Sequence, residues 1–149
     1  KAGGKAGIAL SDPFCVDRHR DSFRTLVKSL DYVIGNEHEW ASLYQTDLSA
    51  ALEQAATDAG LVVCTRSGHD VIVVRGEEEA VVPVKRVVPV DATGAGDQFA
   101  AGFLYGLATG QSLSTSGRMG CVAAAEVISH FGARPETDLK ALFRKEGLI

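Results

Sequence analysis

Short apolar runs alternate with amphipathic stretches along the first part of this chain. Three such runs, at residues 8–11, 32–34 and 61–65, are separated by segments in which apolar residues recur at helical spacing. Valine-rich runs without polar alternation are typical of strands buried on both faces of a sheet. The pattern therefore predicts an α/β fold in which helices cover a sheet. The other predicted strands are 71–74, 80–83 and 87–90, and the predicted helices are 18–30, 37–44, 47–59, 94–107, 113–130 and 138–145.

Composition excludes several classes of protein. The 149 residues carry 15 Lys and Arg against 19 Asp and Glu, and this net charge of -4 argues against a general nucleic-acid binder. No apolar run approaches the roughly 20 residues that a membrane span requires. The cysteines form no CxxC pair and no metal-ligand spacing, so we expect all three to be buried and reduced in a cytoplasmic protein. They are Cys15, Cys64 and Cys121.

The segment 90–103 carries the sharpest chemical signal. Small residues end a predicted strand and begin a predicted helix, where first-turn N–H groups and the helix dipole attract an anion. Asp97 stands in the same turn, and a carboxylate there would repel a phosphate unless it had a task of its own. In phosphoryl transfer a carboxylate orients the acceptor hydroxyl and takes its proton. We therefore expect Gly94, Ala95 and Gly96 to bind the transferred group and Asp97 to act as the base.

Competing explanations of this segment can be compared with the sequence. The chain contains no G-x-x-x-x-G-K-[ST] motif, and Phe99 stands where a dinucleotide fingerprint has its third glycine. An NAD-dependent enzyme is therefore disfavoured. A glycine-rich helix start that serves only close packing remains an alternative from the spacing alone.

The run Asp91-Ala-Thr-Gly-Ala-Gly-Asp97 resembles the C-terminal signature of the ribokinase-like (PfkB) family of carbohydrate and nucleoside kinases. Ala92 stands where that family has Thr or Pro. The resemblance covers nearly the whole chain but only the second half of the family's fold. It implies the C-terminal portion of a ribokinase-like three-layer sandwich, without the lid and the N-terminal strands. Because the chain opens with Lys1 in what resembles the end of a helix, we expect a fragment of a longer protein.

The resemblance also implies binding residues upstream of the signature. Asn36 and Glu39 match the family's N-x-x-E motif, which implies phosphate positioning and a hydrated Mg²⁺ held by Glu39 through water. The turn after the run 61–65 corresponds to the family's nucleotide-contacting turn, which assigns ATP contacts to Thr65 and Gly68. Segments 11–14 and 123–135 resemble adenosine-kinase-like members of the family more than ribokinase itself.

The family commonly has a monovalent-cation site beside its anion-binding turn. By resemblance Asp91, Thr93 and Gly132 are candidate ligands of an ion such as K⁺. Alternatively, Asp91 could fix the turn by accepting backbone N–H bonds. Two other conspicuous side chains are expected to be structural: Trp40 in packing, and His130 as a partner of a helix C-terminus.

The implied activity is an ATP-dependent kinase that phosphorylates a primary hydroxyl of a nucleoside such as adenosine, or of a sugar. The implied partners are a small-molecule acceptor, ATP and Mg²⁺, with neither nucleic acid nor membrane, and a homodimer is possible for the full-length protein. This half alone is expected to be inactive. Two alternatives stay open: a ribose- or fructose-type sugar kinase, and a non-catalytic kinase-like binding or scaffold fragment.

Overall fold

The computed structural model describes residues 3–149, which divide into two compact units. The first unit ends at Val81 and the second begins at Val82. The α/β class predicted from the sequence is confirmed, because strands and helices alternate along the first unit. Within the described residues, no helix combines the length and the apolar character needed to cross a bilayer.

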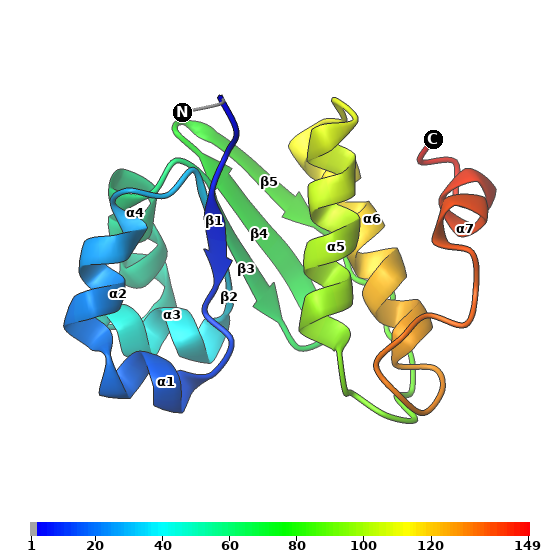
Figure 1. Cartoon of the computed structure of the whole chain (residues 1–149), viewed down its shortest axis with the longest axis horizontal. Helices are drawn as coiled ribbons and strands as arrows, with labels where there is room; N and C mark the ends of the chain where they lie inside the picture. The colour runs from blue at the N-terminus through cyan, green and yellow to red at the C-terminus, as the bar shows by residue number, and fades with distance from the viewer. Residues whose placement is uncertain (1–2) are drawn as a thin grey trace. The chain divides into compact units, whose positions relative to one another are not determined.

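A sheet forms the frame of the first unit (Figure 1). Among the described residues it has five strands in the order β1-β2-β3-β4-β5. The first three are parallel, and β4 is antiparallel to β3. The carboxyl ends of β2 and β3 therefore lie at one edge, where Asn36 pairs in register with Thr65. The strands are β1 (Gly7–Ala9), β2 (Tyr32–Asn36), β3 (Val62–Arg66), β4 (His69–Arg75) and β5 (Glu78–Val82).

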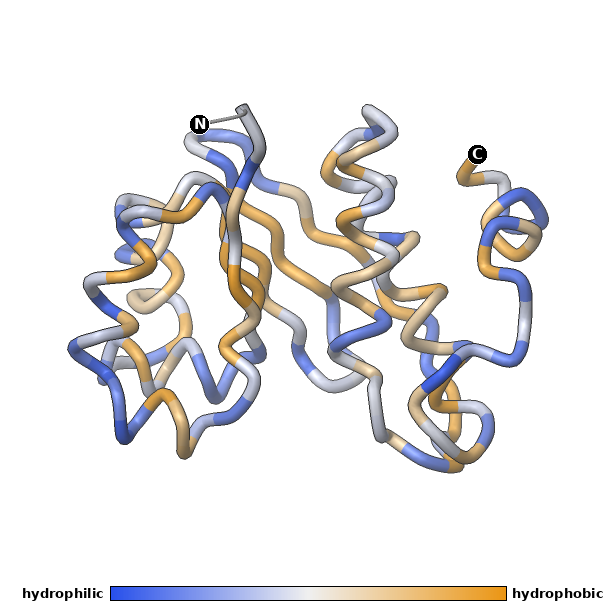
Figure 2. Tube along the Cα trace, in the orientation of Figure 1, coloured by the Kyte–Doolittle hydropathy of each residue, from blue (hydrophilic) through white to orange (hydrophobic). Residues whose placement is uncertain are grey.

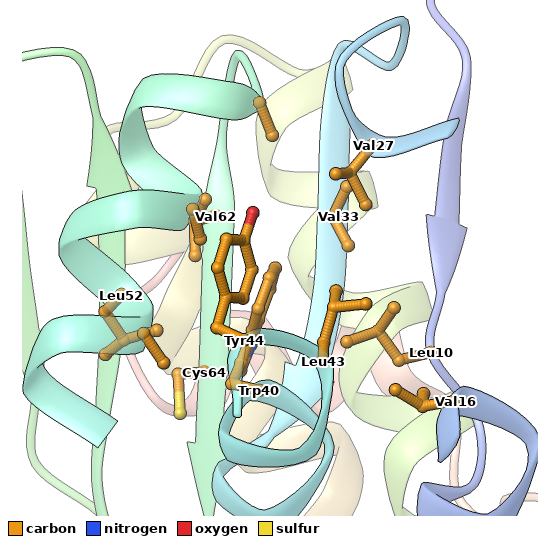
Figure 3. Packing of buried hydrophobic residues seen from close by; sticks show 13 residues of the cluster. Leu10, Val16, Val27, Val33, Trp40, Leu43, Tyr44, Leu52, Val62 and Cys64 are labelled. Atoms are coloured by element: carbon orange, nitrogen blue, oxygen red, sulfur yellow. The ribbon is translucent and has the colours of Figure 1, made fainter. Parts of the chain in front are cut away.

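Four helices of the first unit lie together on one side of this sheet (Figure 1). Figure 2 shows hydrophobic residues along the central strands, and Figure 3 shows how the core forms between strands and helices. Trp40 is fully buried there, as expected, and its indole Nε1 donates to the Val63 carbonyl at 3.0 Å. The helices are α1 (Pro13–Arg18), α2 (Arg20–Val27), α3 (Glu37–Tyr44) and α4 (Leu48–Asp58).

The second unit consists of α5 (Ala95–Ala108), α6 (Leu113–Val127) and α7 (Leu139–Lys145). Glycines let α5 approach α6 closely. A Cβ on Gly102 would lie 2.6 Å from the Met119 carbonyl oxygen, and one on Gly106 would lie 2.6 Å from Ser116 Oγ. Met119 and Ala123 of α6 pack with Phe143 of α7 in a small core.

Three sequence-based predictions were wrong. The helix expected over 18–30 is shorter, because α2 spans only Arg20–Val27. A helix that was not expected, α1, precedes it and begins at Pro13, where Asp12 caps it by accepting from Phe14 N at 2.6 Å. The strand expected at 87–90 has no regular structure, and Val88 is 90 % exposed. Burial of all the cysteines was the third error, since Cys15 is exposed while Cys64 is buried.

Candidate active site

The turn before α5 requires glycine at position 94. Gly94 adopts a left-handed φ of 81°, and a Cβ there would lie 2.8 Å from Ala133 Cβ and 3.0 Å from the Ala133 carbonyl oxygen. Gly94 is also the N-cap of α5 and, among the described residues, no side chain caps this helix. The other helices, α2 excepted, have capping side chains that satisfy first-turn amides. The first turn of α5 is therefore left for another acceptor.

The hydrogen bonds of the turn identify which amides a ligand can use. Ala95 N–H donates to the Ala92 carbonyl at 3.2 Å, and Gln98 N–H donates to the Gly94 carbonyl at 2.9 Å. Between them lie the amides of Gly96 and Asp97, the second and third residues of the helix. A Cβ on Gly96 would meet nothing within 4 Å, so the backbone there is open to approach. Of the predicted donors, Ala95 is engaged inside the turn, and Gly96 lies in open space.

Asp97 is exposed in the first turn of α5, where the sequence places it. An ionised carboxylate has acceptor sites only, so it can receive a hydrogen bond from a hydroxyl and then take its proton. The turn thus combines open amide donors with a proton acceptor.

Asp91 fixes the start of this turn. Its Oδ1 accepts from Thr93 N at 2.9 Å and its Oδ2 accepts from Gly132 N at 3.0 Å. These hydrogen bonds, with that of Gly132 foremost, lower the pKa of Asp91 to about 2. The structure therefore brings together the three residues expected near a monovalent cation. In these contacts Thr93 and Gly132 present N–H groups, whereas such a cation requires oxygen ligands, so the K⁺ site stays a prediction.

Asn36 and Glu39 form a capping box at the carboxyl end of β2. Asn36 Oδ1 accepts from Glu39 N at 2.9 Å, and Glu39 Oε2 accepts from Asn36 N at 2.8 Å. Glu39 Oε1 accepts from Asn36 Nδ2 at 3.0 Å. Glu39 is only 4 % exposed, and its burial raises its pKa. Gly35 makes room for this carboxylate, because a Cβ there would lie 2.7 Å from Leu10 Cδ1 and 3.1 Å from Glu39 Oε2.

The carboxylate oxygens of Glu39 are suited to accept hydrogen bonds from the water shell of a hydrated Mg²⁺. Each carboxylate oxygen already accepts one hydrogen bond and keeps capacity for a second, which suits a bond from a metal-bound water. The described residues contain no group of three or more His, Cys, Asp or Glu side chains that could hold a metal. Nucleotide-bound Mg²⁺ needs no such group, because phosphates and waters complete its shell.

The turn between β3 and β4 lies at the same edge of the sheet. Thr65 is half-buried beside Asn36 in the β2–β3 register, and Gly68 has a φ of 87° in the turn. Sequence reasoning passed over Arg66, whose Nε is buried and has no hydrogen-bond partner within the described residues. Glu37 Oε2 lies 3.9 Å from that nitrogen, beyond hydrogen-bond distance.

Glu126 also went unnoticed in the sequence. Its Oε1 accepts from Glu136 N at 2.9 Å and from Thr137 N at 2.8 Å, and these bonds lower its pKa against the effect of burial. His130 was expected to act only at a helix C-terminus. Its Nδ1 lies 3.2 Å from the Phe131 carbonyl oxygen and its Nε2 lies 3.4 Å from Glu126 Oε2.

Comparisons with known proteins identify kinases of similar sequence and fold. A crystal structure of a probable sugar kinase from Rhizobium etli is 43 % identical with a TM-score of 0.96, over 99 % of this chain and 46 % of that one. An adenosine kinase from Sinorhizobium meliloti is 40 % identical with a TM-score of 0.93, over 97 % of this chain and 45 % of that one.

A third structure shows the fold alone. It is a putative ribokinase II from E. coli in complex with ATP and Mg²⁺, 18 % identical with a TM-score of 0.84, over 98 % of this chain and 48 % of that one. The chain spans less than half the length of the first curated relatives and of these structures. It therefore has the fold of part of a ribokinase-like kinase. A sequence profile described as pfkB family carbohydrate kinase matches residues 1–139, and the chain belongs to this family.

Proposed function

We propose that this chain is the C-terminal, nucleotide-binding half of a kinase that transfers the γ-phosphoryl group of ATP to a primary hydroxyl of a small molecule. The observation that carries the proposal is the α5 N-terminus, which lacks a capping side chain among the described residues and holds Asp97 in its first turn. A helix start that served packing alone would not need an exposed carboxylate beside open amides. The cytoplasmic location and the homodimer expected from the sequence stay predictions.

The residues of this chain would contribute binding and proton transfer. The amides of Gly96 and Asp97 would donate to the terminal phosphate of the bound nucleotide, which is the transferred γ-phosphoryl group of ATP, where negative charge develops, and the β-phosphate of ADP. The Asp97 carboxylate would orient the acceptor hydroxyl and take its proton. Mg²⁺, when bound with the nucleotide, neutralises phosphate charge, and Glu39 would hold its hydration shell beside Asn36. Thr65 and Gly68 would contact the nucleotide.

The acceptor we favour is a nucleoside such as adenosine. The chain is 40 % identical to an adenosine kinase over 97 % of its length. The resemblance of segments 11–14 and 123–135 in sequence favours the same branch. A sugar is the second candidate, since a probable sugar kinase is 43 % identical. A panel of both acceptor classes, tested with the full-length kinase that contains this chain, separates the two.

The test of the proposal is Asp97→Asn in that full-length kinase. We expect ATP affinity to persist and kcat to fall by roughly 10²-fold or more, the scale of losing a general base. Asp21→Asn is a matched control, because Asp21 is also an exposed acid in the first turn of a helix without a side-chain cap among the described residues. Near-normal kcat in Asp97→Asn would exclude the proposed role, and a wild-type enzyme without turnover would favour a scaffold.

A further inference from the structure

The loop between α6 and α7 backs the turn that precedes α5. Its residue Ala133 packs directly on Gly94, and Gln98 Nε2 donates to the Ala133 carbonyl at 3.4 Å. Gly132 N–H donates to Asp91 Oδ2 at 3.0 Å. The position of the turn therefore depends on where this loop lies.

The N-terminal end of the loop is held to the turn by a backbone hydrogen bond. Val90 N–H donates to the Ile128 carbonyl at 2.8 Å. This bond takes the place of the strand ladder that was expected at 87–90. Together with the Asp91–Gly132 hydrogen bond, this contact joins the segment 90–94 to the chain at two positions on the N-terminal side of Ala133. The far end of the loop needs an anchor of its own.

Glu126 supplies that anchor. Its side chain is only 7 % exposed, and Oε1 accepts from both Glu136 N and Thr137 N, ten and eleven residues further along the chain. His130 Nε2 lies 3.4 Å from the other oxygen. Hydrogen bonds to an ionised acceptor are about twice as strong as neutral ones. One carboxylate thus holds the loop where it turns back toward α7.

Stabilisation of α6 itself does not explain this side chain. Glu126 stands in the last turn of α6, where the helix dipole disfavours a negative charge. A basic side chain, not an acidic one, would stabilise the C-terminal end of this helix. The two N–H donors from the loop account for an acid at this place.

We propose that Glu126 is a positioning residue for the anion-binding turn, acting through residues 131–137. By fixing the far end of this loop it holds Ala133 against Gly94, and so sets the amides of Gly96 and Asp97 relative to the Asp97 carboxylate. The effect on ligand binding rests on the proposed function. The mechanical link between Glu126 and the turn is independent of it.

The test compares two near-isosteric variants of the whole 149-residue chain. Glu126→Met keeps the buried volume and cannot accept the two N–H bonds, whereas Glu126→Gln keeps an accepting oxygen. Ser112→Ala is the control, since it removes a cap that accepts Thr115 N–H at the opposite end of α6. One readout is amide hydrogen exchange at Gly132 and Ala95, and the other is affinity for ADP with Mg²⁺.

We expect Glu126→Met to speed exchange at both amides and to weaken ADP binding by about tenfold, the scale of one charge-assisted hydrogen bond. Glu126→Gln should keep most of the wild-type exchange protection and ADP affinity, and Ser112→Ala should change neither quantity. Unchanged exchange in Glu126→Met would overturn the link. Faster exchange with unchanged ADP affinity would overturn the positioning role.

The two failures are distinguishable. If the wild-type chain binds no ADP, the proposed function is refuted and the turn has no nucleotide to bind. The exchange data would still decide whether Glu126 is mechanically linked to the turn. If Glu126→Met does not fold, Thr137→Pro removes one of the two donors from the loop side. That variant should speed exchange at Gly132 as well, and unchanged exchange there would overturn the link.

Discussion

Replacing Gly94 by alanine is the sharpest structural perturbation of the anion-binding turn. A left-handed backbone costs a residue with a Cβ roughly 1–2 kcal/mol. The added methyl would also lie 2.8 Å from Ala133 Cβ and 3.0 Å from the Ala133 backbone, an overpacking that typically costs about 1–3 kcal/mol. The two effects predict a loss of about 2–5 kcal/mol in the free energy of unfolding, a large part of the roughly 5–15 kcal/mol of an ordinary domain.

Gly96→Ala is the matched control, two residues along the same turn. Its Cβ would meet nothing within 4 Å, and alanine is the better helix former by up to about 1 kcal/mol, so stability should stay equal or rise. Urea unfolding followed by far-ultraviolet circular dichroism measures both variants. The fluorescence of Trp40 is unsuitable, because that residue lies in the other unit.

Stability and binding should separate in these two variants. Gly94→Ala should lose both, whereas Gly96→Ala should keep its stability and still bind ADP about tenfold more weakly, since the methyl covers the amide edge that a phosphate would approach. An unfolding free energy of Gly94→Ala within about 0.5 kcal/mol of wild type would refute the steric reasoning. Full ADP affinity in Gly96→Ala would refute the placement of the phosphate.

Three further perturbations follow from buried or titrating groups. Trp40→Phe leaves the Val63 carbonyl without its donor and should cost about 1–3 kcal/mol in urea unfolding. Because burial raises the pKa of Glu39, and a carboxylate must be ionised to hold Mg²⁺, the Mg²⁺ enhancement of ADP binding should fade on acidification at a higher pH than an ordinary glutamate would give. Glu39→Gln should abolish it at every pH. The Phe131 carbonyl and then Glu126 raise the pKa of His130, so its stabilisation is complete below about pH 6.5 and is lost as pH rises through the raised pKa. The urea midpoint should therefore fall toward pH 8 in wild type but not in His130→Gln.

Local signals in the sequence were sufficient for much of the fold. The helix predicted at 37–44 has those bounds in the structure, because the capping pair Asn36 and Glu39 is set by a three-residue spacing. The helix predicted at 47–59 is also present, with Asp47 as its N-cap, accepting from Ala50 N at 3.1 Å. The small residues of the turn before α5 likewise mark its place without knowledge of any distant partner.

Features that depend on distant partners could not be predicted. The valines at 87–90 have strand propensity, yet Val90 bonds to the Ile128 carbonyl and no ladder forms among the described residues. Glu126 reads as an ordinary helical acid, because its donors lie ten and eleven residues away in an irregular loop. Engagement of the Ala95 amide inside the turn depends on the turn's geometry, which spacing alone does not give.

Calorimetric titration of the 149-residue chain with ADP, with and without Mg²⁺, tests the central claim most directly. The chain must first be shown to be folded by circular dichroism. We predict saturable binding of ADP that Mg²⁺ strengthens, that Glu39→Gln makes insensitive to Mg²⁺, and that NAD does not reproduce. A folded chain that ignores ADP, or binds it equally with and without Mg²⁺, would contradict the assignment of the turn and of Glu39 to a nucleotide-binding half.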